Sequence, residues 1–493
     1  MNPLKKLASQ TVVYGLSSIV GRFLNYLLVP FYTRYFTTGE YGVVSEFYAY
    51  SGFFGVLLTL GFETGYFRFV KSENEERLYS TSLTFLSVVS VFFVGIIWLF
   101  TPFLSGKMHY ANHPEYFTWF ALILAFDAIC AIPFAKLRNE NKAFSFAGIK
   151  LFEILVNVGL NLFFIIICKG AYEKDTSSAL GSLYKPEIGV GYVFISNLLA
   201  SVAKLMLLSF SFKGLKSGFD SILFKKILTY SLPMVVIGFA GIINEMLDRV
   251  ILKYLLPFDA EANLQQLGIY AACYKLSIVM SLFIQAFRFA AEPFFFAHAD
   301  KSDSRKIYAD VMNWFVIFCC FIFMVVTLFI DYFGLFIGKD FRVGLGVVPI
   351  LLLANLFLGI YVNLSIWYKL TDRTMTGAYV SLGGALLTIV LNVLLIPKLG
   401  YMGSAYATLV CYASMAGVSY LLGQKFYPVP YDRKKVGGYL LLLLVLHLFH
   451  SHAMDLNKAF FNLPVIFISV IFLLIFLVVV WLLDGRKLRQ MIK

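Results

Sequence analysis

Residues 11–42 have the sequence TVVYGLSSIVGRFLNYLLVPFYTRYFTTGEYG, which predicts a helix that crosses a membrane and the turn that follows it. Polar side chains recur in it every three or four residues and so share one helical face: Thr11, Tyr14, Ser18, Arg22 and Asn25. The residues between them are mostly apolar. An arginine at the middle of a bilayer costs about 2.5–3.5 kcal/mol on insertion scales. We therefore expect Arg22 to face a helix bundle or a water-filled cavity.

A second cation follows at the end of the same segment. Pro30 interrupts the helix, because proline lacks the backbone N–H that a helical hydrogen bond needs, and Arg34 then lies near the far interface. The polar face of the first helix and Arg34 together predict a cationic interior.

The composition is that of a polytopic membrane protein. The chain has 493 residues, of which 60% are hydrophobic and 18% aromatic, and its mean hydropathy is +0.79. These values lie outside the usual range of soluble globular proteins. The formal net charge of +13 does not indicate nucleic-acid binding, because the basic residues lie in short loops between apolar spans and no separate soluble domain is visible.

The apolar spans predict an all-α polytopic membrane protein with about 14 transmembrane helices. They lie near 9–33, 41–66, 82–104, 115–135, 146–168, 188–211, 227–252, 267–294, 309–336, 345–368, 376–397, 402–424, 436–450 and 463–483. Ten of the 41 Lys and Arg fall in one set of loops, Lys253 among them, and six lie within spans. The remaining 25 mark the cytoplasmic side, so both termini are predicted to be cytoplasmic.

The two halves of the chain show a faint repeat. A shift of 226 residues aligns Gly42 with Gly268, and a shift of 233 aligns Lys136 with Lys369. An even number of spans in each half makes such repeats parallel. The expected architecture is a six-helix bundle at 1–212, a second six-helix bundle in parallel pseudo-repeat at 213–424, and two additional helices with a basic cytoplasmic tail at 425–493.

Neither a metal site nor an enzyme active site is indicated. The six cysteines lie in or beside apolar spans without zinc-site or disulfide spacing, so we interpret them as packing residues and expect no metal and no cofactor. His447, His450 and His452 are expected in an interfacial loop. The outer loops are short, the longest covering about 169–187, whereas a membrane enzyme that acts on sugars usually has a larger outer domain.

Two later spans carry further candidates for contact with an anion. In the eighth span, Gln285, Arg288 and Glu292 continue a polar stripe at helical spacing, which must face water or a well-paired interface. Arg288 is the residue that we favour for anion contact. In the seventh span Arg249 lies one turn after Glu245, so the two side chains could instead neutralise each other.

Acidic residues within the spans are candidates for coupling to Na⁺ or H⁺. They are Glu46, Asp127, Glu153, Glu245 and Asp248, and the sequence does not choose among them. Asp127 lies deep in its span, where an unpaired acid would be protonated. Lys150 and Lys204 lie near the cytoplasmic ends of their spans, and we expect both to reach the interface by snorkelling.

Several motifs resemble those of a known family. Residues 21–25, 30–34 and 40–42 (GRFLN, PFYTR and EYG) are similar to the first-helix signature of Wzx-like polysaccharide exporters, the flippases of the multidrug/oligosaccharidyl-lipid/polysaccharide superfamily. Residues 61–69 (GFETGYFRF) resemble the end of their second helix, 230–233 (YSLP) their seventh, and 400–405 (GYMGSA) their twelfth. The resemblance extends over nearly the whole chain.

This resemblance implies a two-lobed flippase of a bacterial inner membrane that works by alternating access. Its substrate would be a polyprenyl-pyrophosphate-linked oligosaccharide for lipopolysaccharide O-antigen or capsule synthesis, moved from the cytoplasmic to the outer leaflet. Arginine suits a pyrophosphate because its planar donor fork matches phosphate oxygens. The expected substrate contacts are Arg22, Asn25, Arg34, Arg249, Gln285 and Arg288.

The implied partners are the lipid-linked oligosaccharide and the bilayer, with other polysaccharide-assembly membrane proteins as candidates and no nucleic acid. Two other functions stay open. A cation-drug antiporter of the same superfamily would share the fold but should favour acids over arginines in its cavity. A membrane glycan polymerase or ligase is the enzyme alternative, which the short outer loops disfavour.

Overall fold

The computed structural model describes residues 20–21, 23–212, 218–299, 303–457 and 464–492, and every regular element in these ranges is a helix. Thirteen of the described helical segments are long and apolar enough to cross a membrane, and each overlaps a span predicted from the sequence. The prediction of an all-α polytopic membrane protein is confirmed. The candidate spans are Thr38–Phe69, Glu75–Lys107, Glu115–Asn139, Ala143–Lys174, Gly191–Phe212, Ser221–Leu255, Ile278–Phe296, Ser304–Leu328, Val347–Leu370, Thr374–Leu399, Tyr401–Phe426, Arg433–Leu456 and Val465–Gly485.

Residues 9–19 and 22 of the predicted first span, 9–33, lie outside the described residues, so Arg22 is not described. Helical backbone is present at 23–26, and α2 (Val29–Tyr35) continues the segment. Pro30 lies in the first turn of α2, where its missing N–H would have no helical partner in any case.

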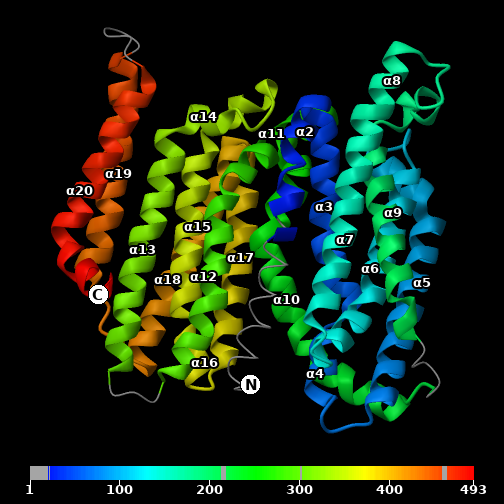
Figure 1. Cartoon of the computed structure of the whole chain (residues 1–493), viewed down its shortest axis with the longest axis horizontal. Coiled ribbons are helices and arrows are strands. Elements are labelled where there is room, and N and C mark those ends of the chain that lie inside the picture. Colours follow the sequence, from blue (N-terminus) through cyan, green and yellow to red (C-terminus); the bar gives the residue numbers. More distant parts are fainter. Residues whose placement is uncertain (1–19, 22, 213–217, 300–302, 458–463, 493) are drawn as a thin grey trace. The chain divides into compact units, whose positions relative to one another are not determined.

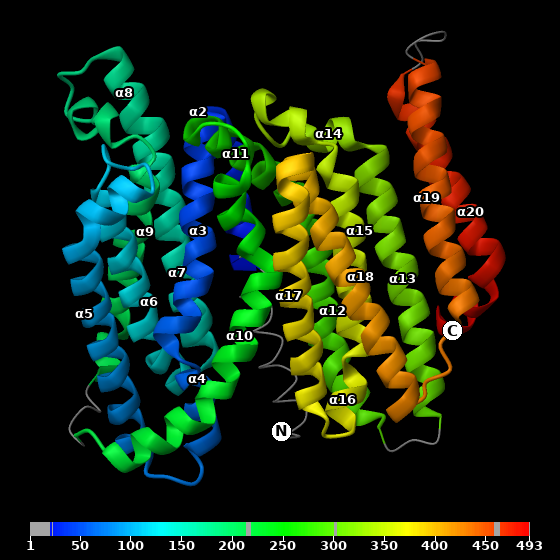
Figure 2. The ribbon, with the colours of Figure 1, turned by 180° about the vertical axis from the view of Figure 1, so that it is seen from behind.

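The chain forms two compact units, Met1–Gly268 and Ile269–Lys493. In each unit, the long helices lie side by side with their axes roughly parallel, as Figures 1 and 2 show. The α11 helix (Ala260–Leu276) crosses the boundary between them. The predicted domains at 1–212, 213–424 and 425–493 rest on the repeat and stay a prediction.

The first unit is organised around α6 (Glu115–Asn139). The other helices of this unit are α3 (Thr38–Thr59), α4 (Phe62–Phe69), α5 (Glu75–Lys107), α7 (Ala143–Leu162), the π-helical turn η1 (Phe163–Cys168), α8 (Lys169–Lys174), the short 3₁₀ turns η2 (Gly181–Leu183) and η3 (Pro186–Ile188), α9 (Gly191–Leu208) and α10 (Ser221–Leu255). The α6 helix packs against α3, α4, α5, α7 and α9. Its apolar window is 67% buried, more than that of any other candidate span in this unit, so it is the central helix.

Local sequence signals set several helix ends in this unit. Thr37 caps α3, because its hydroxyl accepts the Glu40 N–H at 3.3 Å while the Glu40 carboxylate accepts the Thr37 N–H at 2.8 Å. At the other end, Leu60 and Gly61 have φ angles of 44° and 68°, a left-handed turn that separates α3 from α4. Asn74 caps α5 by accepting the Arg77 N–H.

The second unit has α13 and α15 at its core. Its helices are α12 (Ile278–Ala297), α13 (Ser304–Leu328), α14 (Ile330–Gly334), the 3₁₀ turn η5 (Lys339–Gly344), α15 (Val347–Leu364), α16 (Ile366–Leu370), α17 (Thr374–Leu399), α18 (Tyr401–Phe426), α19 (Arg433–Leu456) and α20 (Val465–Ile492). The α15 helix packs against α12, α13 and α18, while α19 and α20 pack against α13. The apolar window of α20 is only 11% buried, which fits the sequence interpretation of a helix that faces lipid.

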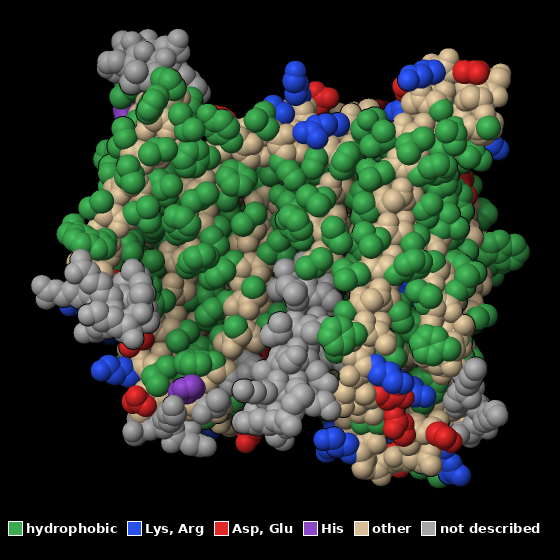
Figure 3. All heavy atoms as spheres, viewed as in Figure 1, with side chains coloured by type: hydrophobic (Ala, Val, Ile, Leu, Met, Phe, Trp, Pro, Cys, Tyr) green, Lys and Arg blue, Asp and Glu red, His purple; other side chains and the backbone are tan. Residues whose placement is uncertain are grey.

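Charged side chains gather at the two ends of the helices. Figure 3 shows hydrophobic side chains over the middle of the helices and Lys, Arg, Asp and Glu near both ends. This distribution is expected of a protein whose middle contacts hydrocarbon, and it makes each charged group in the middle of a span a candidate for function.

The predicted eighth span is divided in the structure. The segment at 267–294 forms the end of α11 and then α12, with a break at Ser277. The Ser277 hydroxyl donates to the carbonyl of Tyr274 at 2.7 Å, and the Asn355 amide donates to that hydroxyl at 3.4 Å. A serine that bonds its own helix favours such a bend. The polar stripe that includes Arg288 therefore lies on α12 alone.

The three histidines lie within α19, so their prediction as an interfacial loop is wrong. His450 is buried and its Nε2 lies 3.1 Å from the hydroxyl of Ser469, which itself donates to the carbonyl of Leu328 at 2.7 Å. Because the Ser469 hydrogen is already used, His450 donates in this pair. The contact joins α19 to α20 and α13.

Candidate functional site

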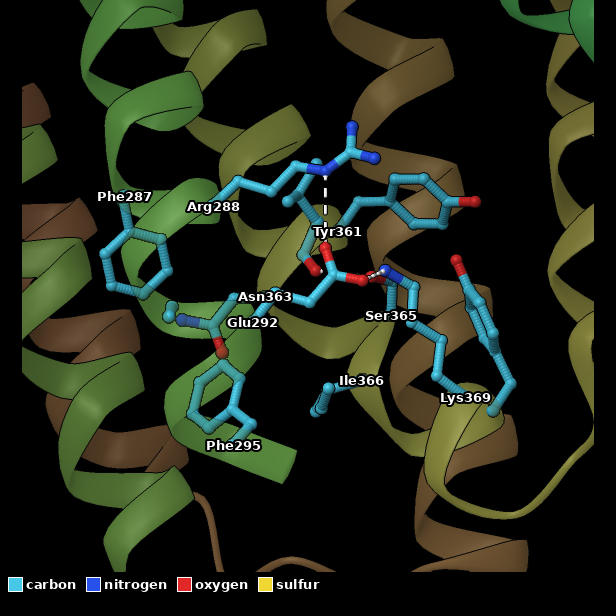
Figure 4. A pocket seen from close by; sticks show the side chains of 12 residues that line it. Phe287, Arg288, Glu292, Phe295, Tyr361, Asn363, Ser365, Ile366 and Lys369 are labelled. Carbon is cyan, nitrogen blue, oxygen red and sulfur yellow. Dashed lines mark hydrogen bonds and ion pairs between the residues drawn. The ribbon is translucent and has the colours of Figure 1, made fainter. Parts of the chain in front are cut away.

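A cavity in the second unit brings together cationic, acidic and amide side chains (Figure 4). It holds about 170 Å³ of space, is open to one side, and is lined by residues of α12, α15 and α16. The lining residues are Phe287, Arg288, Ala291, Glu292, Phe295, Tyr361, Val362, Asn363, Ser365, Ile366, Tyr368 and Lys369. Two of the three helices therefore contribute a cation, and α12 also contributes an acid.

Arg288 must face water. It is the eleventh of the 20 residues of α12, so it lies near the middle of a helix that is about 30 Å long. Its side chain is 62% exposed. A guanidinium exposed to hydrocarbon at this depth would be strongly unfavourable. Arg288 lies on the wall of the cavity, and its contact with an anion stays a prediction.

The second cation, Lys369, is positioned by a buried tryptophan. Trp367 lies on the same short helix, α16, and its indole N–H donates to the carbonyl of Ser419 on α18 at 3.1 Å. Trp367 is fully buried, and a Cβ on Gly423 would lie 3.0 Å from its ring. Packing of this kind fixes α16 against α18 and so fixes the backbone from which Lys369 reaches the cavity.

Glu292 lies between the two cations. Its Oε1 accepts from Lys369 Nζ at 2.7 Å, and its Oε2 lies 3.8 Å from Arg288 Nε, as Figure 4 shows. The C-terminal part of α12 is held in turn by α13, because the Tyr308 hydroxyl donates to the carbonyl of Phe295 at 2.8 Å. With one acid and two cations, the cavity has a formal charge of +1.

An amide in the cavity wall has no hydrogen-bond partner. Asn363 is 2% exposed, and neither its Nδ2 nor its Oδ1 is paired. On the same helix as Arg288, one turn earlier, the Oε1 of Gln285 is also buried without a partner. A buried polar group without a partner is unfavourable by about 1–3 kcal/mol. Asn363 therefore adds an uncharged hydrogen-bonding group to the cavity wall, whereas Gln285 does not line the cavity.

In the first unit, a second set of charges joins α6, α7 and α9. Lys204 Nζ lies 2.5 Å from both Asp127 Oδ1 and Glu153 Oε1, and Lys150 lies 3.5 Å from the other oxygen of Glu153. The Ser201 hydroxyl also donates to Asp127 at 3.0 Å. Lys204 is buried, so the prediction that it snorkels is wrong. Its charge is needed within the unit to neutralise two acids.

A third set of charges is fully buried in the first unit. Glu46 on α3 and Lys253 on α10 form an ion pair with Oε2–Nζ and Oε1–Nζ distances of 2.9 and 3.1 Å. The hydroxyl of Tyr50 donates to Glu46 at 3.0 Å, and Tyr110 also donates to it. Lys253 donates further to the carbonyl of Met108 at 2.8 Å. The prediction that Lys253 lies in an outer loop is therefore wrong.

The surroundings of Glu46 leave little room for a coupling ion. Burial, and then the negative charge of Glu46, raise the pKa of Tyr110 well above its usual value, so Tyr110 remains a protonated donor to the carboxylate. Both carboxylate oxygens are occupied by Lys253 and tyrosine hydroxyls. This arrangement is that of a structural ion pair.

The remaining predicted site residues lie in the first unit. Asn25 and Arg34 are exposed, and Asp248 is buried. The Arg249 guanidinium donates to the carbonyl of Glu245, four residues earlier on α10, at 3.1 Å. Asp248 accepts the backbone N–H of Arg249 at 2.8 Å. The substrate role of Asn25, Arg34 and Arg249 and the coupling role of Glu245 and Asp248 stay predictions.

The sequence interpretation missed two members of the cavity. Lys369 lies just beyond the predicted span 345–368 and stood out only through its alignment with Lys136, although the aromatic pair Trp367-Tyr368 before it indicates a packed helix. Asn363 gave no signal, because one amide in an apolar helix has no distinctive spacing. Among the described residues, no group of three His, Cys, Asp or Glu is placed to hold a metal ion.

Solved transporter structures share this fold over most of their length. The lipid II flippase MurJ in an inward closed conformation matches with a TM-score of 0.72 and 16% identity, over 98% of this chain and 100% of that chain. An inward-facing multidrug resistance MATE family transporter of the MOP superfamily matches with a TM-score of 0.63 and 13% identity, over 88% and 98%. A MATE structure in the straight conformation gives 0.56 and 14%, over 89% and 97%. The chain thus has the fold of the MurJ and MATE transporters.

Sequence comparison gives the family. A model described as "Polysaccharide biosynthesis protein" matches residues 7–298, which is more than half of the chain. The chain belongs to the polysaccharide biosynthesis protein family, as the motifs of the first, second and seventh helices predicted. No curated protein matches the chain.

Proposed function

We propose that this chain is a flippase that moves a polyprenyl-pyrophosphate-linked oligosaccharide across a bacterial cytoplasmic membrane, for synthesis of O-antigen or capsule, by alternating access. Its family and its fold, which is shared with a protein named as a lipid II flippase, support this proposal. Both termini would be cytoplasmic, because most of the Lys and Arg residues fall on that side of the predicted topology.

The observation that carries the proposal is the pairing of Arg288 and Lys369 around one cavity in the second unit. A pyrophosphate carries at least two negative charges, and burying it requires cations and hydrogen-bond donors. Arg288 offers a planar fork of donors, Lys369 a compact ammonium, and Asn363 an unpaired amide. The cavity therefore matches the charged part of the substrate rather than its lipid or its sugars.

The charge balance of the acids argues against a cation-drug antiporter. Such a protein needs an acid that can bind a cation. Glu46, Asp127 and Glu153, three of the five predicted coupling acids, are each bound to a lysine. An organic cation would have to displace these lysines first, which makes the three acids poor sites for it.

Reconstitution in proteoliposomes tests the proposal. A labelled polyprenyl-pyrophosphate saccharide would be scored for its accessibility to an added enzyme, with the wild type and with Arg288→Ala and Lys369→Ala. We expect transbilayer movement by the wild type and at least a tenfold loss in each variant, since each removes a charge that meets the phosphates. Arg305→Ala is the matched control, because Arg305 is an exposed arginine at the start of α13.

Three outcomes would contradict the proposal. Equal movement by wild type and Arg288→Ala would exclude the cavity as the pyrophosphate site. No movement of the lipid, together with gradient-driven uptake of an organic cation, would assign the chain to the antiporters. Joining or cleavage of the glycan by the protein in detergent would assign it to the enzymes.

A further inference from the structure

Glu292 occupies the place that an oxyanion ligand would take in the cavity of the second unit. Each of its carboxylate oxygens faces one cation, at 2.7 Å from Lys369 Nζ and 3.8 Å from Arg288 Nε (Figure 4). A phosphate would use the same two cations. A carboxylate and a phosphate are both anions whose oxygen atoms accept hydrogen bonds, so they compete for the same donors.

The ion pairs of Glu292 are weak enough to be exchanged. Its side chain is 37% exposed and that of Arg288 is 62% exposed. The Lys369 side chain is 27% exposed, so solvent reaches all three charged groups and weakens the ion pairs between them. A ligand that brings two or more negative charges to Arg288 and Lys369 can therefore replace Glu292 with only a small loss of ion-pair free energy.

The two anions exclude each other. With Glu292 among them, the two cations leave the cavity at a formal charge of +1, which cannot balance a pyrophosphate of charge −2 or lower. A carboxylate and a phosphate that share the same two cations repel each other, because both carry negative charge. When a pyrophosphate enters, the Glu292 carboxylate must leave the cations.

One amide in the cavity wall has no hydrogen-bond partner while Glu292 holds the two cations. Asn363 is buried in the wall, and both of its polar atoms are unpaired. Glu292 thus satisfies the charges but not this amide.

We propose that Glu292 is a built-in competitor of the substrate, which holds Arg288 and Lys369 when the cavity is empty and returns to them to expel the pyrophosphate. This inference rests on the proposed function and adds the residue that limits the affinity of the site. Two cations without a competing anion would bind the pyrophosphate more tightly and release it more slowly. A transporter needs release as much as it needs binding.

Binding and transport by the full chain test this inference together. The affinity for labelled undecaprenyl pyrophosphate would be measured in detergent, and turnover of the saccharide-bearing lipid in proteoliposomes. Glu292→Gln should bind undecaprenyl pyrophosphate about tenfold more tightly than the wild type, because the competing charge is lost, and should transport more slowly. Glu292→Asp keeps the charge and should retain an affinity close to that of the wild type.

Controls separate this effect from folding and from the proposed function. Glu63→Gln makes the same change at a half-exposed ion pair with Arg138 in the first unit, and should leave the affinity unchanged. Melting temperatures in detergent identify a variant that does not fold; if Glu292→Gln fails to fold, Glu292→Ala, which also removes the charge, replaces it in the comparison. The wild type could bind undecaprenyl pyrophosphate more tightly than Arg288→Ala does, while Glu292→Gln binds it no more tightly than the wild type. That result would overturn the inference and leave the proposed function standing. Absence of binding by every variant would overturn both the inference and the proposed function.

Discussion

Gly42 on α3 and Gly268 on α11 face each other where the two helix backbones touch. A Cβ on Gly268 would lie 1.9 Å from the carbonyl oxygen of Thr38 and 3.0 Å from the backbone nitrogen of Gly42. A Cβ on Gly42 would lie 2.1 Å from the carbonyl oxygen of Leu264. Small residues that allow helix backbones to approach are a common basis of helix packing in membranes. The repeat in the sequence had aligned these same two glycines.

Alanine at either glycine should destabilise the first unit. The clashing atoms are backbone atoms, so no side-chain rotation can relieve them, and overpacking of this kind typically costs about 1–3 kcal/mol. We expect Gly42→Ala and Gly268→Ala to lower the Tm in detergent. Gly55→Ala, also on α3, is the control, because no atom lies within 4 Å of a Cβ there and alanine favours the helix. If Gly268→Ala were as stable as Gly55→Ala, the backbones would not be in contact.

Removal of one partner from the Glu46–Lys253 ion pair should lower the stability of the protein more than removal of both partners. Each single change, Glu46→Gln or Lys253→Met, leaves a buried charge without its counter-ion, which typically costs about 3–5 kcal/mol. The double variant leaves neither charge and should recover part of the loss in Tm. Glu63→Gln, at an exposed pair, should change stability by less than about 1 kcal/mol. Additive losses in the double variant would contradict the pairing.

The sequence predicted the membrane fold well because hydrophobic length is a local property. Each of the 13 described spans was found from about 20 neighbouring residues. The break at Ser277 was missed because both sides of it are apolar and only the contact with Asn355 marks it. The partner of a charge was also hidden, since Lys204 meets acids from two other helices.

The candidate site was only half visible in the sequence for the same reason. Arg288 could be identified because a mid-span arginine is costly in a bilayer, whatever lies around it. Lys369 could not, because it follows the end of α15 and becomes a cavity residue only through the packing of Trp367 on α18. Asn363 matters only because its amide is unpaired, which is a property of the folded structure.

Loss of Lys204 should be partly rescued by loss of the more buried of its two acids. Lys204→Met leaves Asp127 without a cation and leaves Glu153 with Lys150 alone, at 3.5 Å. The Glu153 side chain is 14% exposed and that of Asp127 is 48% exposed, so Glu153 loses more hydration on burial. When added to Lys204→Met, Glu153→Gln should raise the Tm more than Asp127→Asn does. Equal rescue by the two changes would show that hydration of Asp127 makes no difference.

Cysteine labelling should establish which loops face outward. All six cysteines are buried, so an introduced thiol would react above a low background. Ser72 and Ser182 are matched positions, because each is exposed and donates its hydroxyl to the carbonyl three residues earlier. The excess of bases places the loop with Ser72 in the cytoplasm and that with Ser182 outside. A membrane-impermeant maleimide added to intact cells should therefore label Ser182→Cys at least tenfold faster than Ser72→Cys, and permeabilised cells should label both. The reverse order in intact cells would show that the topology is inverted. The ends of α12 and α16 that carry Glu292 and Lys369 would then lie toward the outer leaflet, where the cavity would release the substrate rather than load it.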